Sequence, residues 1–418
     1  MISNTSIFFF TQKSNFLCPL LANSRAFSRS NFFMKDSSVS KSFFSVLYSF
    51  SLFGSYYIRN TKFKEILDSS VVFSNLEISK TFITESYRDK PEEDLYFSHC
   101  VFHKITSNTN GGAIRLNSYR FTLNISHCGF SLCMAHQSGG AISFYGYQFV
   151  SKFSCYYGCL AIQSEQAICS DLKKISNDEP VENSLNYSLV SQCSPSGSKG
   201  ASRAIFFSSG MQQFCYVNWS NNHVNEESAV LISSFPIEFM LLFSDISKSS
   251  GTNLLWLHKI DIVHALSFVN IHNNTNAPDN AILTIEQSNA VLNSFIFSKN
   301  IGYKYIEGTF KAFLRACIFD VQFSQSLFFD IQIINEGSHF GGKAKIHQIE
   351  FIDTWSCWAI GSISPKPTSL IQSYLNYKER SLSIVLIVLI TTVILSYIIW
   401  IIMAKKNLGD LQPVVIQN

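Results

Sequence analysis

The chain has 418 residues and a formal net charge of +3, with basic and acidic residues interspersed along it. Only 15% of the residues are charged, 14% are aromatic, and 38 residues are phenylalanine. Few charges with many aromatic and β-branched residues favour a β-rich fold, and no basic stripe indicates a nucleic-acid partner. Eleven cysteines are many for a cytosolic chain and favour an oxidising compartment.

The N-terminal segments are the least informative. Residues 1–42 contain no apolar run suited to a signal peptide, and their role stays open. The next segment, 43–94, begins with the apolar run 43–58, which would serve as a signal h-region if translation began at Met34. The alternating pattern that follows favours instead a first coil, so we predict N-terminal capping coils over 43–94.

One short phrase occurs twice, 28 residues apart, and each copy is preceded by a cysteine at that same spacing. The residues are Gly111, Gly112, Ala113 and Ile114, then Gly139, Gly140, Ala141 and Ile142, with Cys100 and Cys128 before them. Two matched motifs at one period in the twenties indicate a solenoid, in which each repeat is one coil stacked on the next.

Each residue type in the phrase has a physical reason. The glycine pair allows a corner with positive φ, or the close approach of a neighbouring coil. The alanine suits a cramped inward position, and the isoleucine begins a strand. Because side chains alternate along a strand, inward positions should stack, with Cys100 over Cys128. Such cysteines are expected either to be bonded as disulfides or to serve as small core residues.

Weaker copies of the phrase continue along the chain. The expected inward alanines are Ala113, Ala141, Ala167, Ala204, Ala229 and Ala281. The long step before Ala204 contains the polar stretch 170–196, which we interpret as a loop bulging from one coil. We predict a parallel β-helix over 95–363, where about ten coils of ~25 residues fit.

The pattern resembles the repeats of chlamydial polymorphic membrane proteins, which pair GGA[ILV] with FxxN, and is more similar still to related surface proteins of trichomonad protozoa. FxxN occurs at 297–300, with degenerate versions at 219–222 and 271–274. The resemblance covers about residues 95–300. It implies a right-handed parallel β-helix displayed at a cell surface. The bacterial members carry a C-terminal autotransporter barrel; this sequence ends differently, so their secretion route is not implied.

The C-terminal segments predict a membrane anchor. Residues 364–380 contain two prolines and form a predicted linker. Residues 381–404 carry no charge, and a helix of that length exceeds the ~30 Å hydrocarbon thickness at ~1.5 Å per residue. We predict one transmembrane α-helix there and a short cytoplasmic tail at 405–418. The flanking basic residues tie at two on each side, so charge does not decide the orientation.

The cysteines and four N-x-[ST] sequons favour an array outside the cell. The sequons are at Asn124, Asn186, Asn218 and Asn273. The predicted localisation is the plasma membrane, crossed once, with the array outside and the C-terminus in the cytoplasm. A tail-anchored protein with its β-helix in the cytosol is the alternative, since no clear signal peptide is present.

We predict no catalytic, cofactor-binding or metal-binding residues. β-Helix enzymes that act on polysaccharide need convergent carboxylates, and the acidic residues here form no ladder. His99 and His127 share a repeat position and should stack, but no third ligand repeats with them. Trp355 and Trp358 would either bind sugars or cap the array. Adhesion or surface recognition of a host-cell surface, glycan or protein ligand is the predicted function, with an enzyme acting on polysaccharide as the alternative.

Overall fold

The chain divides into two compact units, residues 1–363 and 364–418. The computed structural model describes residues 21–23, 32–49, 55–74, 93–118, 121–172, 181–193, 203–224, 227–259, 263–277, 280–287, 289–302, 304–308, 311–343 and 345–349. All of them belong to the first unit. The predicted linker 364–380, span 381–404 and tail 405–418 lie outside the described residues, as do Trp355 and Trp358.

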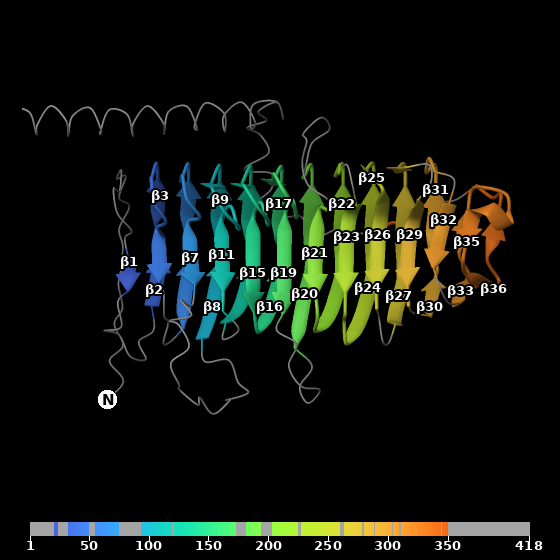
Figure 1. The fold of residues 1–418 in the computed structure, drawn as a ribbon, viewed down its shortest axis with the longest axis horizontal. Helices are drawn as coiled ribbons and strands as arrows, with labels where there is room; N and C mark the ends of the chain where they lie inside the picture. Colours follow the sequence, from blue (N-terminus) through green and yellow to red (C-terminus); the bar gives the residue numbers. More distant parts are fainter. Residues whose placement is uncertain are drawn as a thin grey trace, which may run out of the picture. The chain divides into compact units, whose positions relative to one another are not determined.

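The described residues form an all-β parallel solenoid, as the sequence predicts (Figure 1). Each turn of the chain adds one strand to a 12-stranded sheet and one or two strands to a 20-stranded sheet. In both sheets each strand pairs in parallel with its equivalents in the neighbouring coils, for example Ile114 with Ile142 and Ile142 with Ile168. A parallel ladder of this kind pairs the main-chain groups of every coil except at the ends of the stack.

The strands are as follows. The 12-stranded sheet contains β1 (Leu21–Asn23), β4 (Leu47–Ser49), β7 (Val71–Ser74), β11 (Ile114–Asn117), β15 (Ile142–Gly146), β19 (Ile168–Leu172), β21 (Ile205–Ser208), β23 (Ser228–Ser234), β26 (Asn253–His258), β29 (Ala281–Glu286), β32 (Lys304–Gly308) and β35 (Phe328–Phe329). The 20-stranded sheet contains β2 (Phe32–Lys35), β3 (Ser38–Ser40), β5 (Tyr56–Arg59), β6 (Lys62–Lys64), β8 (Glu93–Ser98), β9 (Val101–His103), β12 (Phe121–Ser126), β13 (Gly129–Ser131), β16 (Gln148–Lys152), β17 (Cys155–Tyr157), β20 (Glu182–Ser191), β22 (Met211–Ser220), β24 (Glu238–Ser247), β27 (Val263–His272), β30 (Ala290–Asn293), β31 (Ile296–Ser298), β33 (Lys311–Arg315), β34 (Ile318–Phe319), β36 (Gln332–Glu336) and β37 (His339–Phe340). Two small sheets contain β10 (Thr106–Ser107), β14 (Met134–Ala135) and β18 (Leu160–Ala161), and β25 (Ser250–Gly251) and β28 (Thr275–Asn276).

The stack is longer at its N-terminal side than the predicted array. Each coil contributes one strand to the 12-stranded sheet. Within the described residues, nine of these strands, β11 to β35, follow residue 95, and about ten coils were expected there. Three more, β1, β4 and β7, precede it and pair in parallel with one another and with β11. The solenoid therefore includes strands from 43–94 and also from 1–42, whose role the sequence left open.

The glycine pair performs both of its expected functions, one per residue. Gly111 and Gly139 have φ angles of +64° and +65°, where a side chain would be strained. A Cβ atom on Gly112 would lie 2.0 Å from the carbonyl oxygen of Gly140 in the next coil. The first glycine of the phrase thus makes the corner, and the second allows two coils to approach closely.

The inward alanine position is confirmed, but its main-chain hydrogen bonding changes at Ala204. Ala113, Ala141 and Ala167 each donate a main-chain hydrogen bond to the alanine of the next coil, at 2.9 to 3.0 Å. Ala204 donates instead to Ser228, not to Ala229. Ala229 is nevertheless fully buried, as is Ala281, so both are inward as expected. The register is irregular between Ser228 and Leu231, where β23 pairs with the next strand, β26.

The interpretation of 170–196 as a loop was wrong. Residues 182–191 form the ten-residue strand β20, which pairs with β16, β17 and β22. Leu185 and Val190 in this strand are fully buried. The strand was missed because serine and asparagine occupy regular inward and corner positions in this solenoid, so polarity does not mark its loops.

The 20-stranded sheet bends at two corners in each coil, and each corner residue has positive φ. At the first corner, His127 (φ 53°) precedes the inward Cys128; at the second corner, Leu132 (φ 54°) precedes the inward Cys133. Cys100 does stack with Cys128, and its main-chain nitrogen lies 3.4 Å from the Cys128 Sγ. Stacking therefore continues between neighbouring coils at the inward side of the first corner.

The interior is filled by ladders of large side chains. Phe63, Phe102, Phe130 and Tyr156 stack with ring centroids 4.7 to 5.0 Å apart and planes within 8°. This is the same repeat position as the phenylalanine of FxxN, where Phe297 stacks on Phe319 at 4.7 Å. Burial of such rings supplies much of the free energy of folding, at ~25 cal/mol per Å² of apolar surface.

Helical structure is minor in the described residues. A single 3-10 turn, η1 (Gln325–Leu327), lies near the C-terminal end of the stack. No helix in the described part of the chain is both long and apolar enough to cross a bilayer. The predicted span 381–404 lies outside that part.

Candidate binding surface

The first corner carries a ladder of aromatic rings on the outside of the solenoid. Every residue of this ring ladder has positive φ, between 47° and 57°. Neighbouring rings are stacked, with centroids 4.7 to 5.0 Å apart and planes within 16°. The seven rings, one per coil, belong to His99, His127, Phe153, Tyr187, Tyr216, Phe243 and Phe268.

None of the seven rings belongs to the buried core. A non-glycine residue with positive φ costs roughly 1 kcal/mol. Ring stacking offsets this cost, at ~0.5–1.5 kcal/mol per pair. Because each ring covers its neighbours' faces, the ladder presents ring edges to solvent. Phe268 at the end of the ladder is 38% exposed.

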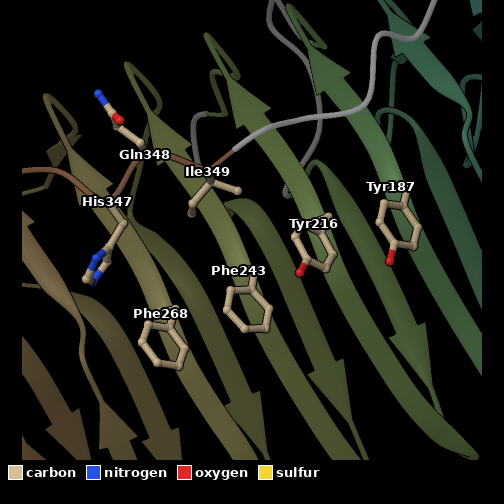
Figure 2. Close-up of a pocket in the computed structure, with 7 residues that line it drawn as sticks. All are labelled: Tyr187, Tyr216, Phe243, Phe268, His347, Gln348 and Ile349. Carbon is tan, nitrogen blue, oxygen red and sulfur yellow. The ribbon is translucent and has the colours of Figure 1, made fainter.

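A cleft lies over the C-terminal part of the ring ladder (Figure 2). Its volume is about 570 Å³. The rings of Tyr187, Tyr216, Phe243 and Phe268 line it on one side, and His347, Gln348 and Ile349 line it on the other. We call residues 345–349 the return segment, because they contact coils that occur much earlier in the sequence.

The return segment is hydrogen-bonded to the outer surface of β27 and its neighbours. Asn270 Nδ2 donates to the carbonyl oxygen of His347, and Asn270 Oδ1 accepts from the main-chain nitrogen of His347, both at 3.0 Å. His347 Nε2 donates to the carbonyl oxygen of Ser294 at 2.9 Å. The imidazole also meets the Phe268 ring edge-on, with centroids 5.8 Å apart.

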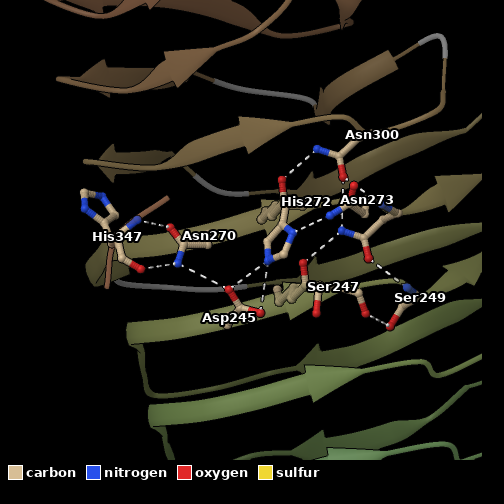
Figure 3. Close-up of polar contacts among 11 residues, drawn as sticks. Asp245, Ser247, Ser249, Asn270, His272, Asn273, Asn300 and His347 are labelled. Atoms are coloured by element: carbon tan, nitrogen blue, oxygen red, sulfur yellow. Dashed lines mark hydrogen bonds and ion pairs between the residues drawn. The ribbon is translucent and has the colours of Figure 1, made fainter. Parts of the chain in front are cut away.

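A polar cluster beside the cleft supports this arrangement (Figure 3). Asp245 Oδ1 accepts from His272 Nε2 at 3.1 Å and from Asn270 Nδ2 at 3.3 Å. Asn273 Nδ2 donates to His272 Nδ1 at 2.7 Å, which places the imidazole proton on Nε2. Both ring nitrogens of His272 are therefore engaged, so this cluster orients Asn270 and offers no free base.

The predicted histidine pair is confirmed as an outward stack. His99 and His127 lie parallel at 4.7 Å, at the start of the ring ladder. Their Nδ1 atoms are each 2.8 Å from the hydroxyl of the preceding residue, Ser98 or Ser126. Partial burial, with a smaller contribution from His99, lowers the pKa of His127. No group of three His, Cys, Asp or Glu residues in the described part of the chain could hold a metal ion.

Eight cysteines of the described residues are free thiols, and six of these eight are buried. Cys100, Cys128, Cys133, Cys159, Cys169, Cys193, Cys215 and Cys317 are free, whereas Cys155 is disulfide-bonded. Burial raises the pKa values of Cys128, Cys159 and Cys193 well above that of an ordinary thiol. These groups stay protonated near neutral pH, and they pack as small apolar residues.

The four sequons differ in accessibility. Asn273 is exposed at the second corner, with φ of +55°. Asn186 is buried at 7% exposure, and its Oδ1 accepts from the main-chain nitrogen of Cys215 at 2.9 Å. Asn124 and Asn218 lie on strands and are partly exposed. Of the four, Asn273 is the most exposed, and its Nδ2 also donates to His272 Nδ1.

Beyond the predicted pair of His99 and His127, the ring ladder was missed in the sequence although a signal for it exists. A ring-bearing residue followed by Cys, Ser or Val recurs once per coil, as in His127-Cys128, Phe153-Ser154 and Phe268-Val269. The small second residue faces inward and the ring faces outward. The sequence pattern was hidden because imidazole, phenol and phenyl rings alternate at one position.

These features define the chain as an all-β protein built as a parallel solenoid with an outer aromatic ladder. No protein-family model, no curated protein and no solved structure matches it.

Proposed function

We propose that this protein is a single-pass membrane protein that displays a right-handed β-solenoid outside the cell and recognises an extended protein partner there. The ring ladder is the observation that supports recognition, and the exposed sequon at Asn273 and the predicted span at 381–404 support the topology. Parallel β-crossovers are almost always right-handed, which supports the handedness. The resemblance to surface-protein repeats points the same way.

The partner is proposed to be a polypeptide because of how the rings are presented. Sugars pack on ring faces, and in this ladder the faces are covered by neighbouring rings about 5 Å away. Ring edges, together with the hydroxyls of Tyr187 and Tyr216, suit apolar side chains and main-chain groups. An extended segment lying across the coils would meet an equivalent ring at each ~4.8 Å step.

An enzymatic role is not proposed. Within the described residues, His272 and Asp245 form the only histidine–carboxylate pair beside the cleft. Both ring nitrogens of His272 are hydrogen-bonded, Nε2 to Asp245 and Nδ1 to Asn273. A general base would need one of them free to take a proton from a substrate.

Peptide and glycan arrays probed with the full-length protein in detergent test the proposal. We expect saturable binding to peptides with spaced apolar residues and none to glycans. Phe243→Ser in the cleft should reduce the binding at least tenfold, whereas Phe206→Ser, an outward ring on β21, should leave it unchanged. Binding to glycans alone, or equal binding by both variants, would overturn the proposed partner class.

Topology has its own test, the removal of N-glycans from the native protein. We expect a gel shift that Asn273→Gln reduces and that Asn186→Gln leaves unchanged, because Asn186 is buried and accepts a main-chain hydrogen bond. If no glycan is present and the protein deleted for residues 381–418 stays in the cytosol, the tail-anchored alternative is correct.

A further inference from the structure

Three aromatic rings stack on the outer face of the 20-stranded sheet, in its early coils. Phe33 on β2, Tyr57 on β5 and Tyr96 on β8 share one register position. Their ring centroids are 4.9 to 5.0 Å apart, and their planes lie within 9°. Phe33 and Tyr57 are 36% and 37% exposed, so these rings face solvent. We call this set the short ring stack; its rings lie on strands, whereas those of the ring ladder lie at the first corner.

The short ring stack ends at Tyr96, and one face of that ring has no aromatic neighbour. Tyr57 covers the face that is turned toward the preceding coil. The opposite face is turned toward the next coil, where the register partner of Tyr96 is Asn124 on β12. Among the described residues, no second ring stacks on Tyr96. Its free face therefore lies one strand spacing, ~4.8 Å, from the coil that carries the Asn124 side chain.

Asn124 is the first residue of the sequon 124–126, and its side-chain amide is not engaged. The residue is partly exposed, and its amide makes no hydrogen bond within the described part of the chain. In contrast, Asn186 accepts a main-chain hydrogen bond, and Asn273 Nδ2 donates to His272. The amide nitrogen of Asn124 can thus carry a substituent without the loss of a hydrogen bond.

The outer face is covered on the other side of Asn124. Its register partner in the following coil is Val150, and the partner of Val150 is Ser184. Both are on the outer face, because the adjacent Phe149 and Leu185 belong to the interior core. Val150 and Ser184 are nevertheless only 7% and 0% exposed. A group attached to Asn124 therefore has exposed rings on one side and covered residues on the other.

We propose that Asn124 carries an N-linked glycan whose first sugar, an N-acetylglucosamine, packs its apolar face on the free ring face of Tyr96. The C–H groups of a sugar carry partial positive charge, and the face of an aromatic ring is negative. The inference rests on the proposed location of the solenoid outside the cell, and it names a modification and a sugar contact there. With this sugar in place, the short ring stack, like the ring ladder, presents only ring edges.

The attachment is a glycosyl transfer from an oligosaccharide that is linked to a lipid through a diphosphate. Asn124 Nδ2 forms a bond to C1 of the first sugar, and the bond from C1 to the diphosphate oxygen breaks. The lipid diphosphate leaves with the electron pair, and the amide loses one proton. The transfer precedes folding, because in the folded chain Asn124 lies within a paired strand and the Ser126 hydroxyl is 2.8 Å from His127 Nδ1.

Glycopeptide mapping of the full-length protein by mass spectrometry tests the attachment. We expect a glycan on Asn124 and another on Asn273. A glycan on Asn273 with Asn124 unmodified would overturn this inference and leave the proposed topology intact. Glycans on none of the four sequons would overturn the inference and the proposed topology together.

The rate at which a peptide N-glycosidase releases the glycan from native protein tests the sugar contact. Tyr96→Ser should speed release from Asn124 about fivefold, because the linkage loses a contact of ring-pair strength, whereas Tyr96→Phe keeps the ring face and should keep the rate. Tyr145→Ser removes an exposed tyrosine of the other sheet and should leave the rate unchanged. Equal rates for Tyr96→Ser and the unaltered protein would overturn the contact.

Two internal reporters separate loss of the contact from loss of the fold. Cys128 is fully buried in the same coil as Asn124, so its thiol reacts with iodoacetamide only when that coil opens. Release from Asn273, in a distant coil, should have the same rate in every variant. Faster release from Asn124 that appears only together with labelling of Cys128 would overturn the sugar contact.

Discussion

The coils before and after residue 200 use the same corner position with different chemistry. At the inward side of the second corner, three of the earlier coils have Cys133, Cys159 and Cys193, and three of the later coils have Asn222, Asn274 and Asn300. Ile105 and Ser249 hold this position in two other coils. Each cysteine Sγ lies 3.5 to 3.7 Å from a carbonyl oxygen of the preceding coil. Each asparagine Nδ2 donates to the equivalent carbonyl oxygen at 2.7 to 3.0 Å.

The asparagines also do what the cysteines do poorly. The Oδ1 atom of each asparagine also accepts the main-chain N–H of the residue at the same position in the preceding coil, at 2.9 to 3.1 Å. These donors are Cys193, Ser249 and Asn274. A thiol is a weak donor and a weak acceptor, whereas an amide satisfies both groups. The comparison teaches that this position requires a small side chain that bridges two coils, and that the later coils bridge them more strongly.

The largest expected effect breaks the asparagine ladder. Asn274→Ala should lower the free energy of unfolding by about 3 kcal/mol, since it leaves the Ser249 N–H and the Ile246 carbonyl buried without partners. Urea denaturation measures the change. Asn117→Ala, at the exposed end of β11, is the control and should change stability by less than ~0.5 kcal/mol. Equal effects of the two substitutions would show that the ladder contributes nothing.

The next largest effect is a pH dependence of the free energy of unfolding, which arises from His103 in the earlier coils. Burial, with smaller contributions from Lys104 and Lys64, lowers the pKa of His103 to about 4. Because the unfolded chain then binds the proton more tightly, stability should be constant above pH 6.5 and fall as the pH decreases toward 4, by about 2 kcal/mol. Denaturation midpoints at pH 7 and 4.5 measure this loss.

The matched variant for this pH effect is His103→Ser, because Ser131 occupies the same register position in the next coil. It should remove most of the slope, leaving the contributions of His127 and His223, whose pKa values are lowered in the same direction. An unchanged slope in His103→Ser would assign the pH dependence elsewhere.

The smallest expected effect comes from placing a cysteine of the earlier coils at an asparagine position of the later coils. Asn222→Cys should cost about 1 kcal/mol, less than Asn274→Ala, because the thiol keeps a weak contact with the carbonyl oxygen of Val190. Urea denaturation measures it, with Asn117→Cys as the control. A cost as large as that of Asn274→Ala would mean that a thiol cannot bridge the two coils.

The phrase copies at residues 111–114 and 139–142 were enough to predict a parallel solenoid, its inward alanines and the stacking of Cys100 on Cys128. FxxN was found at 297–300 and, in degenerate form, at 219–222 and 271–274. Residues 130–133 and 156–159 occupy the same positions with cysteine in place of asparagine, and they were missed because geometry, not residue type, defines the position. The cleft was not predictable from local sequence, since it joins residues 187 and 349.

The sequence by itself determined the period, the parallel coil and the inward residues, because small or apolar side chains recurring at one spacing have few other ways to be buried. Only the tertiary structure decided where β20 lies, where the register shifts at Ser228, and that the outward rings form one ladder. Those features depend on which residues of different coils meet, and that is set by stacking over many coils and by the return of 345–349 across them. A local pattern holds no information on either.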